Sequence, residues 1–159
     1  MTFSIRKATQ NDMPRVLELI VELAIFEKEP NAVEVSVADL IKAGFQEPKA
    51  FTCFVAEQDG KVEGMALVYH RFSTWKGKVL HLEDLVVSQE QRGSGMGTAL
   101  LDEVVNYGKE LGVKRISWEV LDWNDSAIEF YEKKGADVKR DWNVVHLNED
   151  HMNNYIASR

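Results

Sequence analysis

A glycine-rich run over residues 91–98 is the part of this sequence with the clearest chemical meaning. It reads Gln-Arg-Gly-Ser-Gly-Met-Gly-Thr and lies between an apolar segment, residues 85–87, and apolar residues at helical spacing from Leu100 to Leu111. A glycine-rich turn that leads into a helix presents unpaired backbone N–H groups at the positive end of the helix dipole. Such groups bind phosphate or pyrophosphate, and glycine lets the anion approach the backbone. Arg92 adds a positive charge at the rim.

Two familiar phosphate loops do not fit this run. A P-loop needs Lys and then Ser or Thr after its last glycine, whereas Thr98 and Ala99 follow Gly97 here. A dinucleotide fingerprint needs a third glycine where this chain has Leu100, and its first glycine follows the strand almost at once, whereas residues 88–91 intervene here. The run therefore predicts another phosphate-containing ligand. The alternative is a glycine-rich connection that binds nothing.

Composition narrows the class of protein. The chain has 159 residues, 45% hydrophobic and 28% charged, which predicts one soluble globular domain spanning residues 1–159. No apolar run reaches membrane-spanning length and no secretory signal opens the chain, so we expect a cytoplasmic protein that binds no membrane. The net charge of −7 argues against a nucleic-acid partner. It is compatible with a cationic small substrate, and equally with a surface that only aids solubility.

Metal and thiol chemistry have little support in the sequence. The four histidines are scattered, without the spacing of metal ligands, so we expect no metal. The single cysteine, Cys53, lies in an apolar segment without a nearby histidine. We expect it to be a buried strand residue.

The order of predicted elements indicates an α/β fold (α+β, mixed). We expect strands over residues 3–7, 51–57, 62–72, 78–87 and 115–120, with one or two more within 136–147. We expect helices from about 16 to 27, after Ser36, from the glycine-rich run to Gly112, over 125–134 and over 149–157. This order predicts a central twisted mixed sheet of about six to seven strands with helices on both faces. The glycine-rich run would then lie where two parallel strands splay apart.

The arrangement Arg92-x-x-Gly95-x-Gly97, after a segment that reads Leu-Glu-Asp-Leu-Val-Val, resembles the acetyl-CoA pyrophosphate loop of the GNAT acyltransferase superfamily. Nearly the whole chain is similar to its diamine (spermidine/spermine) N-acetyltransferase branch, through residues 5–9, 73–78, 82–84, 92–98, 123–124 and 130–131. One departure is that the diamine branch has an aspartate before Pro-Trp, where this chain has Ser73-Thr74-Trp75. That form is similar to the thialysine-type sub-branch, whose acceptors resemble lysine analogues.

The resemblance implies roles for individual residues. Acetyl-CoA would be held by the segment before the loop, the loop itself and the start of a later helix, namely Leu85, Val86, Val87, Arg92, Gly93, Ser94, Gly95, Met96, Gly97, Thr98, Asn124, Asp125, Ser126 and Ala127, together with Tyr131. Tyr131 would be the general acid, and Glu83 would face the amine. Phe26, Glu27, Ser117, Trp118 and Glu119 would line the acceptor channel. The resemblance also implies a homodimer.

The chemistry of amine acetylation independently supports catalytic or binding roles for several of these residues. An alkylammonium with a pKa of about 10.4 must lose a proton before it attacks a thioester, and Glu83 and Asp84 are the best candidates to bind and deprotonate it. Tyr131 is protonated at neutral pH and can donate to the leaving thiolate, although a phenol there can also be a packing wedge. Trp75, in a turn, is a candidate for the channel wall or for a dimer interface.

The sequence therefore predicts an acetyl-CoA-dependent N-acetyltransferase that acts on a small cationic amine: a polyamine, a diamine or a lysine analogue. Two alternatives stay open. One is a non-catalytic acyl-CoA-binding or sensor domain, which the presence of both Glu83 and Tyr131 disfavours. The other is a protein-lysine or N-terminal acetyltransferase. It would need an open groove for a peptide, whereas the segments 26–50 and 139–144 are placed to wall off the channel.

Overall fold

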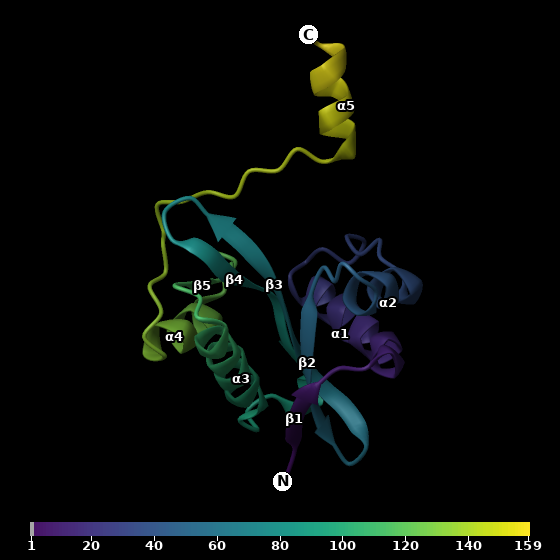
Figure 1. Ribbon diagram of the computed structural model, residues 1–159, viewed down its shortest axis with the longest axis vertical. Coiled ribbons are helices and arrows are strands. Elements are labelled where there is room, and N and C mark those ends of the chain that lie inside the picture. Colours follow the sequence, from purple (N-terminus) through teal and green to yellow (C-terminus); the bar gives the residue numbers. More distant parts are fainter. Residues whose placement is uncertain (1) are drawn as a thin grey trace. The chain divides into compact units, whose positions relative to one another are not determined.

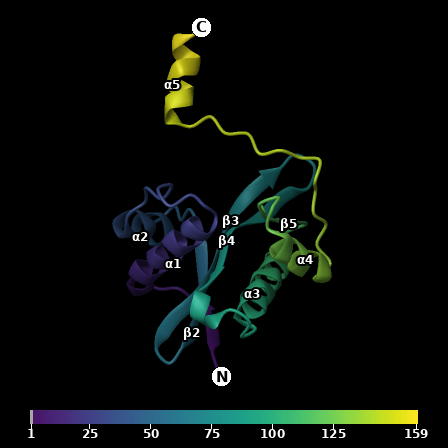
Figure 2. The ribbon, with the colours of Figure 1, turned by 180° about the vertical axis from the view of Figure 1, so that it is seen from behind.

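The computed structural model describes residues 2–159. Its contacts divide the chain into two compact units, Met1–Glu119 and Val120–Arg159. The first unit holds a five-stranded sheet in the order β1-β2-β3-β4-β5, with α1 and α2 along one face and α3 along the other (Figures 1 and 2). Helices on both faces of a mixed sheet were predicted, and this arrangement is confirmed.

The strands pair antiparallel with one exception. β1 (Ser4–Lys7) pairs with β2 (Thr52–Gln58), β2 pairs with β3 (Lys61–Ser73), and β3 pairs with β4 (Gly77–Val87). β5 (Ile116–Ser117) is parallel to β4 and meets it only at Leu80↔Ile116 and His81↔Ser117. β4 continues to Val87, so the two parallel strands pair at one end and no ladder joins them beyond His81 within residues 2–159.

Local sequence signals explain the turns and the helix ends. Asp59 and Gly60 join β2 to β3 with φ of 53° and 76°, the left-handed pair that suits a tight hairpin. A short 3-10 turn, η1 (Gln10–Asp12), precedes α1 (Met13–Phe26). Ser36 caps α2 (Val37–Phe45) by accepting a 3.1 Å hydrogen bond from the N–H of Asp39. α3 (Met96–Leu111) follows η2 (Gln89–Gln91) and ends at Gly112, whose φ is 74°.

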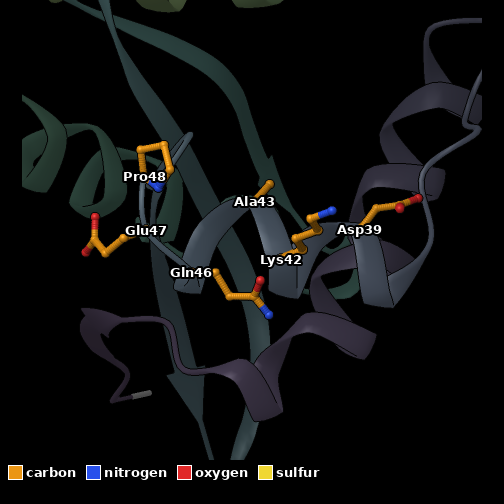
Figure 3. A pocket seen from close by; sticks show the side chains of 6 residues that line it. All are labelled: Asp39, Lys42, Ala43, Gln46, Glu47 and Pro48. Carbon is orange, nitrogen blue, oxygen red and sulfur yellow. The ribbon is translucent and has the colours of Figure 1, made fainter.

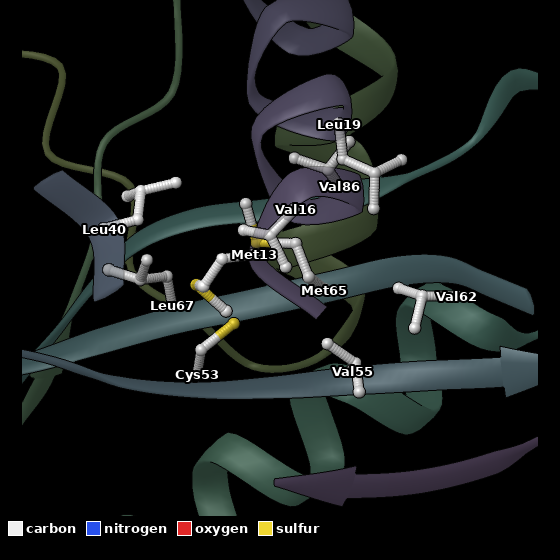
Figure 4. Packing of buried hydrophobic residues seen from close by; sticks show 10 residues of the cluster. All are labelled: Met13, Val16, Leu19, Leu40, Cys53, Val55, Val62, Met65, Leu67 and Val86. Atoms are coloured by element: carbon white, nitrogen blue, oxygen red, sulfur yellow. The ribbon is translucent and has the colours of Figure 1, made fainter. Parts of the chain in front are cut away.

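The middle strands are mostly apolar because both of their faces are buried, with Glu63 as a buried charged exception. Phe54 packs edge-on against Tyr107 of α3, with ring centroids 5.2 Å apart. The opposite face packs against α1 and α2 through one buried cluster, which Figure 4 shows: Met13, Val16, Leu19, Leu40, Cys53, Val55, Val62, Met65, Leu67 and Val86. A sheet covered on both sides loses the polar alternation of a solvent-facing sheet, as seen over residues 62–68, all of which are buried.

The predicted strand count was wrong. The sheet has five strands rather than six to seven, and residues 136–147 contain none. The side chains of Trp142, Val144 and Val145 are 68%, 59% and 86% exposed. A strand needs a hydrogen-bonding neighbour, and this apolar segment has none in its own chain within residues 2–159. β5 is also shorter than the predicted strand over residues 115–120.

The second unit contains two helices, both predicted. α4 (Asp125–Lys133) begins at Asn124, whose side-chain oxygen accepts a 3.3 Å hydrogen bond from the N–H of Ala127. α5 (Glu149–Ala157) begins at Asn148 and has no buried residue. Within residues 2–159 no helix combines the length and the apolar character needed to cross a bilayer.

Candidate active site

The glycine-rich loop is an open helix start. Gly93 and Gly95 have φ of 83° and 88°, a left-handed conformation that side chains of other residues rarely adopt. Gly95 is the N-cap of α3 and has no side chain with which to cap the first turn. Ser94 Oγ lies 3.4 Å from the backbone nitrogen of Met96, and the N–H groups of Gly97 and Thr98 are too early in the helix for intrahelical partners. The loop therefore ends in an uncapped helix start, and its use as a pyrophosphate site stays a prediction.

A buried carboxylate holds the start of this loop, and the sequence did not reveal it. Glu63 accepts a 3.0 Å hydrogen bond from Ser88 Oγ, and its backbone oxygen accepts a 2.7 Å bond from the N–H of Ser88. Arg15 Nη2 lies 3.2 Å and Lys61 Nζ 3.3 Å from the same carboxylate, whose side chain is 6% exposed. Burial by itself would raise the pKa of Glu63, but the Ser88 bond and the two cations outweigh it and lower the pKa. A lone Glu inside an apolar strand is the signal that would have found it.

The loop is also tied to the end of α1. The N–H of Gln89 donates a 2.9 Å hydrogen bond to Glu22 Oε1. The guanidinium of Arg92 lies over the ring of Phe26 at 5.2 Å from its centroid, a cation–π distance. Phe26 was predicted on the acceptor side and Arg92 on the cofactor side, and the structure brings the two residues together.

A β-bulge gives the neighbouring carboxylates Glu83 and Asp84 a common face. Leu67 pairs with Asp84 and Val68 pairs with Leu82, so Glu83 is an extra residue in β4. In a regular strand, two successive side chains point to opposite faces. Here Asp84 lies opposite Leu67 on the face of α1, and Glu83 interacts with two residues of that same face, described next.

Glu83 lies beside Tyr69 and His81. Burial, followed by the charge of Glu83, raises the pKa of the Tyr69 phenol. His81 Nε2 is 4.0 Å from Glu83 Oε1. Tyr69 and His81 are cross-strand partners with ring centroids 5.2 Å apart. Half of the Glu83 side chain remains exposed, at 53%, so it stays accessible to a substrate.

Asp84 is the most perturbed carboxyl of this face. Burial raises its pKa from 3.8 to about 6, and the negative charges of Glu83 and Glu27 add to the effect. Burial also raises the pKa of Glu27, the residue that follows α1. Asp84 therefore feels two neighbouring negative charges, and no cation offsets the rise of its pKa. A site of this kind attracts an ammonium group.

His81 is a residue of this site that sequence reasoning missed. It is 5% exposed, and its Nδ1 lies 2.9 Å from Arg71 Nη1 and 2.9 Å from Ser117 Oγ. Burial, followed by the charge of Arg71, lowers the pKa of the imidazole, which is therefore neutral at pH 7. Ser117 was predicted to line the acceptor channel, and the structure places it one imidazole ring away from Glu83.

The remaining predicted acceptor residues have different surroundings. Trp118 and Glu119 directly follow β5, and Trp118 is half-buried. Trp75 lies at the tip of the β3–β4 hairpin with its side chain 78% exposed. The turn there is held by Ser73 Oγ, which accepts hydrogen bonds of 3.1 Å from the N–H groups of Trp75 and Lys76. Ser73, which stands where the diamine branch has aspartate, thus serves the hairpin itself.

The predicted cofactor residues after Val120 belong to the second unit. Asp125, Ser126 and Ala127 form the first turn of α4, after the capping residue Asn124. Tyr131 lies in α4 next to Phe130, with ring centroids 5.5 Å apart. Two N–H groups of this turn are already paired, that of Asp125 with the carbonyl oxygen of Trp123 at 3.0 Å and that of Ala127 with the side-chain oxygen of Asn124 at 3.3 Å.

Two shallow hollows lie in the first unit. One of about 300 Å³ is lined by residues of α2 and the segment after it, which Figure 3 shows: Asp39, Lys42, Ala43, Gln46, Glu47 and Pro48. None of these is a predicted site residue. The other, of about 270 Å³, reaches Tyr69, whose pKa is raised by the charge of Glu83. Among residues 2–159, no three His, Cys, Asp or Glu side chains are grouped so that they would hold a metal ion.

Comparison with known proteins agrees with this geometry. The sequence profile described as the acetyltransferase (GNAT) family matches residues 14–136. Thialysine N-epsilon-acetyltransferase of Bos taurus is 37% identical over 140 residues, which cover 83% of this chain and 82% of that protein. Spermidine/spermine N(1)-acetyltransferase-like protein 1 of Homo sapiens is 32% identical over 160 residues, which cover 94% of this chain and 23% of that protein.

A solved structure has the same fold as this chain. An integron cassette protein from the mobile metagenome of V. cholerae matches with a TM-score of 0.79 at 22% identity, over 98% of each chain. At that identity the match shows the fold alone. The resemblance drawn from the sequence, including the thialysine-type sub-branch, is confirmed by the matches to the family and to the bovine protein. This chain belongs to the acetyltransferase (GNAT) family.

Proposed function

We propose that the protein transfers the acetyl group of acetyl-CoA to the primary amine of a small cationic acceptor. The observation that carries this proposal is the bulge at Glu83, because it turns two adjacent carboxylates toward one face and leaves Asp84 with a pKa of about 6. A base whose pKa lies near the working pH is suited to take a proton from a bound ammonium. Members of this family use acetyl-CoA as the acetyl donor, and the open helix start after β4 suits its pyrophosphate.

The proposed reaction is a direct transfer within a ternary complex. Acetyl-CoA supplies the thioester. Glu83, with Asp84, holds the acceptor ammonium and removes one proton, directly or through a water. The freed nitrogen lone pair forms the new C–N bond as the C–S bond breaks. A backbone N–H near Val86 or Val87 binds the oxyanion, and Tyr131 gives its proton to the departing sulfur.

The proposed cofactor contacts follow the predicted residues. The backbone of Leu85, Val86 and Val87 pairs with the pantetheine arm, and residues 92–98 hold the pyrophosphate. Asn124, Asp125, Ser126 and Ala127 supply the second contact region. Support comes from the left-handed glycines of the loop and from the uncapped start of α3 that follows them.

The proposed acceptor site is formed by Glu83, Asp84, Phe26, Glu27, Trp75, Ser117, Trp118 and Glu119. Its support is the acidic face formed by Glu83, Asp84 and Glu27, in which the charges of Glu83 and Glu27 both act on Asp84. Phe26 is the last residue of α1 and directly precedes Glu27, and Ser117 contacts His81 beside Glu83.

We further propose that both units form one acetyltransferase domain, that the protein is a cytoplasmic homodimer, and that it binds neither nucleic acid nor membrane. The family profile spans residues 14–136 and so crosses the boundary between the units at Glu119, which supports a single functional domain. The exposed apolar side chains of residues 142–156 support self-association. Light scattering on the purified protein would measure the oligomer, and a monomeric mass would contradict the dimer.

The decisive experiment measures acetyl-CoA turnover with a panel of amines. The free thiol of the released coenzyme A is the readout. We expect turnover with spermidine, putrescine, thialysine or lysine, and binding heat with acetyl-CoA alone. Binding without turnover on any amine would favour the sensor alternative. Turnover only on peptides would favour the protein-lysine alternative. No heat with acetyl-CoA would remove the basis of the proposal.

A further inference from the structure

Arg71 is an exposed cation beside the acidic face. It lies in β3, and its Nη1 donates a 2.9 Å hydrogen bond to Nδ1 of the buried His81. Within residues 2–159, Arg71 forms no ion pair with a carboxylate at salt-bridge distance. A guanidinium has five N–H donors, so the bond to His81 leaves most of the planar fork available to a ligand.

The hydrogen bond from Arg71 fixes the state of His81. A guanidinium only donates, so Nδ1 of His81 must accept, and the ring proton is on Nε2. His81 is then neutral and directs an N–H toward Glu83, 4.0 Å away. The imidazole therefore separates two opposite charges, with Arg71 on one side and the carboxylate of Glu83 on the other.

The arrangement of these charges matches a particular class of acceptor. Arg71 and Glu83 lie at the two nitrogens of one imidazole ring, at 2.9 Å and 4.0 Å, so an anion-binding group and a cation-binding group flank the same ring, and a lysine-like amino acid carries the two complementary charges at its two ends. The distal ammonium of such a molecule suits Glu83 and Asp84. Its α-carboxylate suits the bidentate fork of Arg71. A diamine would instead bring a second ammonium toward the guanidinium and be repelled.

We propose that Arg71 binds the α-carboxylate of the acceptor and makes this site select a lysine-like amino acid over the diamine of the same length. This inference rests on the proposed function and adds the residue that sets acceptor class. Glu119 supports it. Its charge acts on both Tyr69 and His81, so a carboxylate is at hand for the α-ammonium of the same acceptor.

The test compares pairs of acceptors that differ by one carboxylate, lysine with cadaverine and ornithine with putrescine. We expect the wild-type protein to have the higher kcat/KM on the amino acid of each pair. Arg71→Met should lower kcat/KM for the amino acids by roughly tenfold to a hundredfold, mainly through KM, because a hydrogen-bonded ion pair is lost. It should leave the diamines unchanged or improve them. Arg71→Lys, which keeps the charge without the fork, should fall in between.

The control is Lys78→Met, which removes an exposed cation from the same hairpin without touching His81, and which should leave the preference unchanged. Equal losses on both members of each pair in Arg71→Met would overturn the inference, since Arg71 would then act through His81 alone. A wild-type preference for the diamines would overturn it too. Neither result affects the proposed function. That proposal fails only if the wild-type protein acetylates no amine although its thermal unfolding transition shows that it is folded.

Discussion

Ser88 Oγ donates a 3.0 Å hydrogen bond to the buried carboxylate of Glu63, and the N–H of Ser88 donates to the backbone oxygen of the same residue. Ser88 is the residue between the end of β4 and the turn that carries the glycine-rich loop. The direction in which the chain leaves the sheet therefore depends on a charged group that is itself held by Arg15 and Lys61.

We predict that Glu63→Gln destabilises the fold and weakens acetyl-CoA binding together. Loss of charge-assisted bonds to a buried carboxylate should cost about 2–3 kcal/mol, measured by urea unfolding. Calorimetry should show a higher Kd for acetyl-CoA. Glu57→Gln is the matched control, because Glu57 pairs with Arg6 at 2.7 Å on a half-exposed surface away from the loop. A normal Kd in Glu63→Gln would show that the network does not position the loop.

We predict that Asp84→Asn makes the fold more stable and the enzyme worse. The folded-state pKa of Asp84, about 6, lies above its ordinary value of 3.8, so the folded protein binds the extra proton. The contribution of protonated Asp84 to the free energy of unfolding is complete below the ordinary pKa. It is lost as pH rises through 6, because the buried carboxyl then becomes charged. At pH 7.5 the variant should gain up to about 3 kcal/mol over the wild type, with the two converging near pH 4. The KM for the amine should rise.

Urea unfolding at several pH values measures the first effect, with Asp102→Asn on the exposed side of α3 as a control for the change in net charge. A stability difference for Asp84→Asn that does not change between pH 4 and 7.5 would contradict the burial of a repelled carboxylate. An unchanged KM would remove Asp84 from the acceptor site.

We predict that Gly95→Val abolishes tight acetyl-CoA binding while the protein stays folded. The φ of 88° disfavours any side chain by about 1–2 kcal/mol, and a branched one would stand at the helix start where the pyrophosphate belongs. Gly60→Val has the same backbone penalty, at a φ of 76° with open space around it, but lies in the β2–β3 turn. Calorimetry should find the Kd raised by roughly tenfold or more in the first variant only. Equal affinities would contradict the loop assignment.

We predict that Tyr131→Phe lowers turnover by roughly 10²–10⁴-fold, the usual range for loss of a general acid, with little change in acetyl-CoA affinity. Tyr155→Phe removes an exposed hydroxyl from α5 in the same unit and should be silent. Stopped-flow or steady-state rates and calorimetry separate the two effects. If turnover and affinity fell in parallel, Tyr131 would be a binding residue and no proton donor.

The sequence was sufficient where a feature is local. The cap at Ser36 and the helix end at Gly112 each depend on a few adjacent residues, and both were predicted. The contact between His81 and Arg71 joins two strands, and the bulge at Glu83 is a property of pairing between β3 and β4. Neither is visible in a one-dimensional pattern. The strand expected within residues 136–147 has the right side chains, but a strand also requires a neighbour, which the sequence does not specify.

Cys53, the single cysteine of the chain, is 5% exposed, and burial, followed by the charges of Asp12 and Asp84, raises the pKa of its thiol to about 12. A thiolate at neutral pH is therefore scarce and sterically shielded. The folded protein should not react with a disulfide dye, so the colour in a coenzyme-release assay reports product alone. On denaturation one equivalent of reactive thiol should appear per protein chain. The same reagent therefore measures the fraction of unfolded protein.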